Sequence, residues 1–270
     1  MKDLYYNIIN NNKNKSKYLW NIIKTQKKVI KNNNDIPKVI IQYWDSCDSI
    51  PNDVLKCMET WKKFAKNEIK YILYNKESAR KFIEYNLKQK NVKAFDNCIH
   101  PALQADYFRL CYILVKGGAY IDSDDICLHD NIDYFFEGER LKVQALCYDL
   151  KLEQMVNTNE AYNNKFMEER VYYVNNNPLI APPNNPIIKR ALKTATENLL
   201  KKLDRDFQAI SGPGNLVNSI IWFYIKDKSF YKNIEILIDW DEKVVSKWPL
   251  NYRNDMRNWR NFKVGVNNNE

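Results

Sequence analysis

The stretch HPALQADYFRLCYILVKGGAYIDSDD, residues 100–125, carries the strongest structural signal of this sequence. Pro101 suits the first turn of a helix, because its missing N–H would have no partner there. Apolar side chains then recur at helical spacing, and the tandem Gly117-Gly118 suits the end of a helix. The stretch therefore predicts one long helix, followed by a short strand, AYID, that ends in a group of aspartates.

Segments typical of strands and of helices alternate on both sides of this stretch. The predicted strands cover residues 36–44, 68–75, 119–122, 141–149, 170–174 and 234–240. The predicted helices cover residues 51–66, 76–90 and 100–118, and two more begin near residue 186 and after the Gly-Pro-Gly turn at 212–214. Residues 176–185 are expected to form a loop. Such alternation predicts an α/β fold, and the nearly continuous apolar run at 36–44 is typical of a central strand in a parallel sheet.

The chain divides by composition into two parts. Residues 1–34 are rich in Asn and Lys and have only a weak helical period, which predicts a helical extension. Residues 35–270 contain all the predicted strands and are expected to form one domain, a size that suits a single α/β unit.

The bulk composition bounds the function. Apolar residues make up 45% of the chain, which is enough for a sizeable core, and the net charge of +9 comes mostly from scattered lysines. A basic balance favours anionic ligands such as nucleotides, but no nucleic-acid-binding motif is present, so we expect no nucleic-acid partner. The six cysteines form no C-x-x-C pair, which is typical of reduced thiols. With no apolar run long enough for a membrane span and no signal peptide, we expect a soluble, cytoplasmic protein, of the bacterial cytosol or of virus-infected host cytoplasm.

The aspartates of DSDD, residues 122–125, have several interpretations. Asp clusters at strand ends often serve as turns or helix caps. A calcium loop of the EF-hand type is excluded, because the glycine required at its sixth position is absent. A phosphohydrolase of the haloacid-dehalogenase type, with Asp122 as nucleophile and Asp124 as acid, matches locally but lacks recognisable later motifs. The remaining interpretation is a D-x-D site, in which a divalent cation binds the carboxylates together with a diphosphate.

Four segments, taken in order, resemble glycosyltransferase family 32, a family of D-x-D sugar transferases, and more distantly the glucosyltransferase domain of the large clostridial toxins. The segments are IPKVIIQYW, the pair Thr60-Trp61 leading to YILYN, ALQADYFRLCYILVKGGAYIDSDD, and NPLIAPPNNP followed by SGPG. They span about residues 36–215, and the third is the most specific. The resemblance implies a GT-A type single domain with a Rossmann-like, mainly parallel sheet flanked by helices.

The resemblance also implies a reaction. The family transfers a hexose or N-acetylhexosamine from a UDP- or GDP-sugar to a glycan or protein acceptor, with Mn²⁺ or Mg²⁺ as cofactor and with retention of the anomeric configuration. Asp122 would contact the ribose or the sugar, and Asp124 would bind the metal directly, with Asp122 as a second candidate ligand. Asp106 and Arg109, three residues apart on the predicted helix, would hold sugar hydroxyls and the diphosphate.

Three further residues of the donor site follow from the resemblance. Trp44 would stack on the nucleotide base, Tyr120 would line the donor pocket, and Asn177 would lie beside the transferred sugar. Each also has an ordinary structural interpretation, since Trp44 and Tyr120 are typical core aromatics and Asn177 is one of three consecutive asparagines. Asp106 and Arg109 likewise have the spacing of a common surface ion pair.

The chain departs from the family pattern at two places. The first motif usually has histidine where this chain has Ile41, and the C-terminal part usually carries a His-His-Trp-like segment, whereas no histidine follows His129. The candidates for a further metal ligand are therefore the segments 246–248, with Ser246 and Trp248, and 257–259, with Asn258 and Trp259. His100 and His129 are either metal ligands or structural residues. A non-catalytic protein that binds nucleotide sugar or nucleic acid is the remaining alternative.

Overall fold

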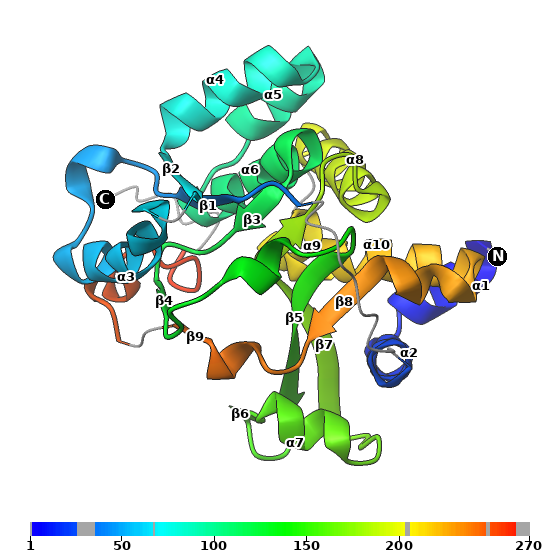
Figure 1. The fold of residues 1–270 in the computed structure, drawn as a ribbon. Helices are drawn as coiled ribbons and strands as arrows, with labels where there is room; N and C mark the ends of the chain where they lie inside the picture. The colour runs from blue at the N-terminus through cyan, green and yellow to red at the C-terminus, as the bar shows by residue number, and fades with distance from the viewer. Residues whose placement is uncertain (1, 26–35, 67, 203–205, 247–248, 263–270) are drawn as a thin grey trace, which may run out of the picture.

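A central sheet of seven strands forms the core of the computed structural model, which describes residues 2–25, 36–66, 68–202, 206–246 and 249–262 (Figure 1). Its strands are β1 (Val39–Tyr43), β2 (Lys70–Tyr74), β3 (Gly118–Tyr120), β5 (Leu141–Asp149), β6 (Gln154–Met155), β7 (Arg170–Ala181) and β8 (Ile234–Leu237). A separate ribbon pairs β4 (Asp125–Cys127) with β9 (Val244–Ser246). All the predicted strands are present.

Most strands of the sheet run in the same direction. The order is β2-β1-β3-β7-β5-β6, and β8 pairs with β5. Strands β2, β1 and β3 are mutually parallel, and so are β5 and β8, while β7 runs antiparallel between β3 and β5. Five of the seven strands therefore share a direction, and the predicted α/β fold with a mainly parallel sheet is confirmed.

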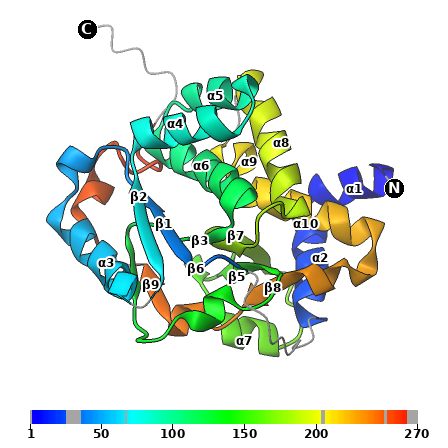
Figure 2. The same ribbon diagram turned by 45° about the horizontal axis from the view of Figure 1, so that its top comes forward.

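Helices cover the sheet. They are α1 (Lys2–Ile9), α2 (Asn12–Lys24), α3 (Asn52–Lys62), α4 (Lys76–Asn86), α5 (Gln89–Asp96), α6 (Pro101–Lys116), α7 (Thr158–Asn163), α8 (Pro186–Leu200), α9 (Phe207–Ile210) and α10 (Pro213–Lys226). Figure 2 shows α4, α5, α6 and α8 gathered on one side of the sheet. The other side is covered by Trp61 of α3 together with Phe135, Phe136 and Trp240. The helix predicted over 76–90 is in fact two helices, α4 and α5.

The connection from α6 to β3 explains why the chain needs two glycines there. Gly117 and Gly118 have φ values of +69° and +109°, which side-chain-bearing residues rarely adopt. A Cβ atom on Gly118 would lie 2.8 Å from the carbonyl oxygen of Val39 in the neighbouring strand. The glycine pair thus ends α6 and lets the chain enter the sheet at once against β1, which fixes where the aspartates after β3 emerge.

Strand β7 corrects the prediction of a loop at residues 176–185. The strand continues to Ala181 and pairs with β3 through its last residues. Its pairing with β5 shifts register, so that residues 175–178 lie opposite Gln144 alone. Pro178 has no N–H to donate, and such a residue is tolerated in a sheet at a bulge. The NNNP sequence is therefore an irregular segment within a central strand.

The N-terminal helices pack into the main core. Leu19 and Ile22 of α2 are fully buried, and the hydroxyl of Ser16 accepts a 2.8 Å hydrogen bond from the backbone N–H of Tyr172 in β7. Residues 2–24 are thus helical apart from a short turn, while residues 26–34 of the predicted extension lie outside the described residues. The division at residue 34 stays a prediction.

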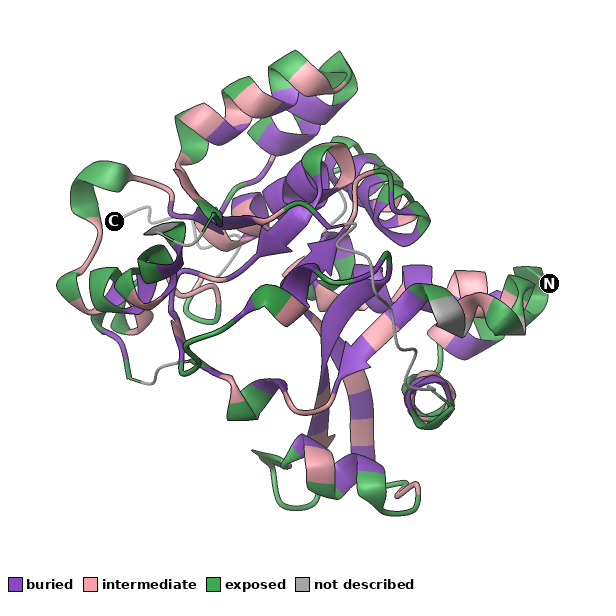
Figure 3. Ribbon diagram, in the orientation of Figure 1, coloured by how far each residue is buried: buried purple, intermediate pink, exposed green. Residues whose placement is uncertain are grey.

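Burial follows the sheet and the inner faces of the helices (Figure 3). All six cysteines lie within the described residues and none is in a disulfide; only Cys47 is exposed. Among the described helices, none combines the length and the apolar character that a membrane crossing requires.

Candidate functional site: a carboxylate-lined cavity

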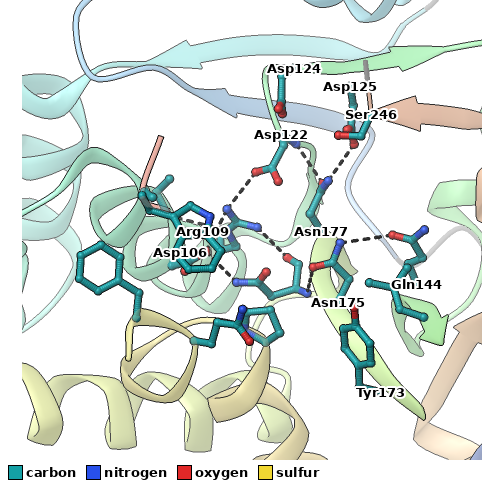
Figure 4. Close-up of a pocket in the computed structure, with 18 of the residues that line it drawn as sticks. Asp106, Arg109, Asp122, Asp124, Asp125, Gln144, Tyr173, Asn175, Asn177 and Ser246 are labelled. Carbon is teal, nitrogen blue, oxygen red and sulfur yellow. Dashed lines mark hydrogen bonds and ion pairs between the residues drawn. The ribbon is translucent and has the colours of Figure 1, made fainter. Parts of the chain in front are cut away.

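A cavity of about 900 Å³ opens at the carboxyl ends of β1 and β3. Its walls come from α6, the turn between β3 and β4, the irregular part of β7, and the C-terminal segment around residues 252–260. Figure 4 shows Asp122 facing Arg109, and Asn177 of β7 facing Asp125. Crevices at the carboxyl ends of parallel strands are the usual ligand sites of such sheets, and this volume suits a sizeable ligand.

Asp106, Arg109 and Asp122 form one ion-paired cluster in this cavity. The Nη2 atom of Arg109 lies 3.1 Å from Oδ1 of Asp106 and 2.9 Å from Oδ1 of Asp122. The Arg109 side chain is only 4% exposed, and its guanidinium lies over the Tyr120 ring at 4.3 Å. The interpretation of Asp106 and Arg109 as an ordinary surface pair is therefore wrong, because both side chains are largely buried.

The electrostatics of the cluster reflect this burial. Burial raises the pKa of Asp106, although Arg109 and the Asn176 amide oppose the shift. Burial also raises the pKa of Asp122 to about 6, with Asp124 and Asp106 adding to the shift and Arg109 opposing it. Burial works against the charge of Arg109, but the carboxylates outweigh it and its pKa is raised. Arg109 therefore stays charged and holds two carboxylates that repel each other.

The asparagines of the β7 bulge organise the cluster. The Asn176 side chain donates a 2.8 Å hydrogen bond to Asp106, and the backbone carbonyl of Asn176 accepts a 3.0 Å bond from Arg109. Asn177 accepts a 2.9 Å bond from the backbone N–H of Asp122 and donates a 2.7 Å bond to Asp125. Both ends of the Asn177 amide thus hold the turn between β3 and β4, whereas Asn175 lines the cavity and donates to Gln144.

Asp125 also lines the cavity but is more deeply buried than Asp124. It is 2% exposed, and burial raises the pKa of its carboxyl well above the usual value, with Asp124 and Asp122 adding to the shift. The side chains of Asn177 and Ser246 both hydrogen-bond to it. A neutral carboxyl that donates one bond and accepts another fits these partners.

The raised pKa of Asp125 predicts a pH dependence of stability. The folded state keeps a proton on this carboxyl that the unfolded chain loses near pH 4. The contribution of Asp125 to the free energy of unfolding is therefore complete below that pH and declines as the pH rises. Asp125→Asn keeps the hydrogen bonds without the charge. We expect the free energy of unfolding of this variant, relative to that of the wild type, to increase between pH 5 and pH 8. Urea unfolding without metal measures this difference. A difference that does not change with pH would contradict this.

Asp124 contacts the C-terminal segment. Its Oδ2 atom accepts a 2.7 Å hydrogen bond from the hydroxyl of Tyr252 and is ion-paired with Nη2 of Arg253. Both side chains belong to a 3-10 turn at Asn251–Asn254. A basic side chain therefore neutralises the carboxylate that the sequence assigns to a metal.

Trp44 and Tyr120 both line the cavity. The Trp44 ring packs edge to face against Tyr252, with centroids 5.2 Å apart, and its Nε1 is buried without a hydrogen-bond partner among the described residues. Tyr120 is 1% exposed and lies beneath Arg109, so it acts chiefly by supporting that guanidinium. Ile41, which stands where the family usually has histidine, is fully buried in the core.

The candidates for a further metal ligand lie around the cavity in different ways. Ser246, Asn258 and Trp259 line it, whereas Trp248 is outside the described residues. Ser246 is bonded to Asp125, and the Asn258 side chain donates to the carbonyl of Arg253. The two histidines lie elsewhere. His100 caps α6 by accepting from the N–H of Ala102, a structural role, and His129 is exposed on the surface.

Sequence reasoning missed four residues of the site: Asn175, Asn176, Tyr252 and Arg253. The asparagines adjoin Asn177, so the NNN run itself was the available signal, and only its register was unknown. Tyr252 and Arg253 lie between the two C-terminal segments considered for metal ligands and carry no recognisable motif. Their proximity to Asp124 depends on a contact across 128 residues of chain.

The donor set at the cavity is compatible with a hard divalent cation. No group of three or more His, Cys, Asp or Glu side chains within the described part of the chain is placed to hold an ion. Mg²⁺ sites, however, commonly use one or two carboxylates and complete their shell with substrate phosphates and water. Asp124, with Asp122 two residues away, supplies such a half-site in a cavity that has room for the phosphates.

Comparison with known proteins places this region in context. Residues 51–141 match the family model described as "Glycosyltransferase sugar-binding region containing DXD motif". An uncharacterized glycosyltransferase of Acanthamoeba polyphaga mimivirus is 28% identical over 116 residues, which are 40% of this chain and 45% of that protein. The chain therefore matches less than half the length of that relative. The solved structure of the PaToxG glycosyltransferase shares 16% identity and a TM-score of 0.49, over 84% of this chain and 78% of that one. The match of residues 51–141 to the family model confirms the predicted resemblance to D-x-D sugar transferases.

Proposed function

We propose that this chain, whose residues 51–141 match the model of the glycosyltransferase sugar-binding region containing the DXD motif, transfers a sugar from a nucleotide sugar to an acceptor. One observation carries the proposal. The D-x-D carboxylates Asp122 and Asp124 face a cavity that also contains the buried Asp106–Arg109 pair, and all four residues fall within the matched region. A divalent cation held by these carboxylates would also bind the phosphates of a nucleotide sugar, whose negative charge suits the nearby Arg109.

The donor is proposed to lie along the cavity with its base near Trp44 and its sugar near Asp106. Asp106 accepts hydrogen bonds from sugar hydroxyls, while Asp122 does so from the sugar or the ribose. Asp124 binds the cation, Mn²⁺ or Mg²⁺, which when bound stabilises the negative charge on the departing diphosphate. Arg109 keeps Asp106 and Asp122 ionised and in place, and it supplies positive charge close to the phosphates.

We further propose that the anomeric configuration is retained and that no side chain acts as a nucleophile. The acceptor oxygen bonds to the anomeric carbon as the bond from that carbon to the diphosphate oxygen breaks. The acceptor proton passes to an oxygen of the leaving diphosphate on the same face of the sugar. Support comes from Asp106 and Asp122, the carboxylates assigned to the sugar, because both are held by Arg109 and so are poor nucleophiles.

UDP- and GDP-sugars both fit this proposal, and so do glycan and protein acceptors. A panel of nucleotide sugars with Mn²⁺, tested by thermal melting, separates the donors. The matching donor is expected to stabilise the protein by about 2.7 kcal/mol at a hundredfold excess over its dissociation constant. Nucleoside monophosphates serve as the control, because they lack the diphosphate. Equal stabilisation by monophosphates, or none by any nucleotide sugar, would contradict the proposal.

A further inference from the structure

Arg253 is the positive group that contacts Asp124 in this structure. Its guanidinium is ion-paired with Oδ2 of Asp124, and the two side chains are 14% and 12% exposed. The hydroxyl of Tyr252 donates to the same oxygen. A carboxylate this deeply buried needs a compensating charge, and in this structure Arg253 supplies it.

The guanidinium and a metal ion compete for this carboxylate. A hard cation binds a carboxylate oxygen at about 2.0–2.6 Å and removes other positive groups from it by repulsion. The Arg253 contact and direct metal coordination at Oδ2 of Asp124 therefore oppose each other. Metal binding at this oxygen without any other ligand must weaken the ion pair and bring two positive groups close together inside the cavity.

The backbone around Arg253 is well anchored, so this exchange needs only a rotation of its side chain. The Arg253 carbonyl accepts hydrogen bonds from the side chains of Asn258 and Asn261, at 2.8 and 3.2 Å. The N–H of Asn251 donates a 2.8 Å bond to Asp53 of α3, and Leu250 is buried beside Trp44. A displaced Arg253 side chain therefore stays at the cavity, where a diphosphate is the obvious new partner for its guanidinium.

We propose that Arg253 is a diphosphate-binding residue that holds the place of the metal at Asp124 until the donor arrives. The proposal rests on the nucleotide-sugar function given above and adds the order of events at its site. When metal binds alone, the protein loses the Arg253–Asp124 pair. When metal binds with nucleoside diphosphate, two new pairs replace it: Asp124 with the metal, and Arg253 with the diphosphate. Mn²⁺ and nucleoside diphosphate must then strengthen each other's binding, by the same factor in each direction.

The test compares Mn²⁺ binding by the wild type and by Arg253→Gln. Free Mn²⁺ is measured by electron paramagnetic resonance, first without nucleotide and then with saturating UDP or GDP. For the wild type we expect nucleotide to strengthen Mn²⁺ binding within the usual coupling range of about 5–150-fold. For Arg253→Gln we expect Mn²⁺ alone to bind at least about tenfold tighter than to the wild type, and the coupling to nucleotide to shrink.

Arg257→Gln is the matched control. Arg257 lies in the same segment and lines the same cavity, but it pairs with Asp255 and not with Asp124. Arg257→Gln removes an equal charge but leaves the Arg253–Asp124 ion pair in place. The Mn²⁺ affinity without nucleotide should therefore stay close to the wild-type value. If Arg253→Gln and Arg257→Gln change that affinity equally, or neither changes it, the inference is overturned.

The measurement also separates this inference from the function on which it rests. Mn²⁺ binding that nucleotide strengthens equally in all three proteins overturns the role of Arg253 and leaves the proposed donor site standing. No Mn²⁺ binding by the wild type with either nucleotide contradicts the metal-dependent function and this inference together. Circular-dichroism melting of each variant verifies that the compared proteins are folded.

Discussion

Asp124→Asn is expected to lower the rate of sugar transfer on the order of 10²–10³-fold, the effect typical of losing one preorganised electrostatic contact to the charge of the transition state. Asparagine has nearly the size of aspartate and still accepts a hydrogen bond from Tyr252, but it has no charge with which to bind a hard cation. The loss should appear in kcat, measured as nucleoside diphosphate released from the matching donor with saturating Mn²⁺. Asp122→Asn is expected to behave similarly, because it removes the other carboxylate of the D-x-D pair.

Asp130→Asn provides the control for these two variants. Asp130 belongs to the same acidic stretch, but its side chain is fully exposed and pairs with Lys63 on the surface. Its replacement should leave the transfer rate unchanged. Wild-type rates in both Asp122→Asn and Asp124→Asn would show that the D-x-D carboxylates take no part in the reaction.

The second large effect is on stability. Arg109→Met is expected to lower the free energy of unfolding by about 3–5 kcal/mol, the usual cost of removing one partner from a buried ion pair. The guanidinium is 4% exposed and holds both Asp106 and Asp122, so its loss leaves two buried carboxylates without their cation. Transfer should fall as well, because the sugar-binding carboxylates lose their positions. Urea unfolding at pH 8, above the pKa of about 6 of Asp122, measures the change.

Arg80→Met is the matched control for Arg109→Met. Arg80 also bridges two carboxylates, Asp96 and Glu84, but all three side chains are exposed. Solvent and salt screen such pairs, so the change in stability should be much smaller than for Arg109→Met. Arg109→Lys keeps the charge without the planar fork and should recover part of the stability. Equal effects of Arg80→Met and Arg109→Met would contradict the buried-cluster account.

The parts of the fold that could be predicted are those in which local chemistry determines structure. Pro101 and the pair Gly117-Gly118 set the ends of α6 through backbone geometry alone, and α6 in turn places Asp106 and Arg109. The short strand after the glycines then brings Asp122 to Arg109. The positions of Asp106, Arg109 and Asp122 could therefore be predicted from a single stretch of sequence.

The rest of the site depends on contacts that no local pattern records. The NNNP run reads as a loop, because asparagine and proline are typical turn residues, yet residues 175–178 are a bulge inside a central strand. The bulge is needed because β7 pairs with both β3 and β5. This double pairing can be seen only in the assembled sheet. Arg253 and Asp124 meet across 129 residues of chain, so their pairing has no signal at either position.

The most direct test of the central claim is a proton NMR time course of the donor that best stabilises the protein in the melting panel. With Mn²⁺ and wild-type protein, we predict that the anomeric signal of the nucleotide sugar is lost while free sugar or glycoside and nucleoside diphosphate accumulate. EDTA and Asp124→Asn should each stop this change. Nucleotide sugars that all stay intact, in a protein that instead hydrolyses a simple phosphomonoester such as p-nitrophenyl phosphate, would contradict the account and identify a phosphohydrolase.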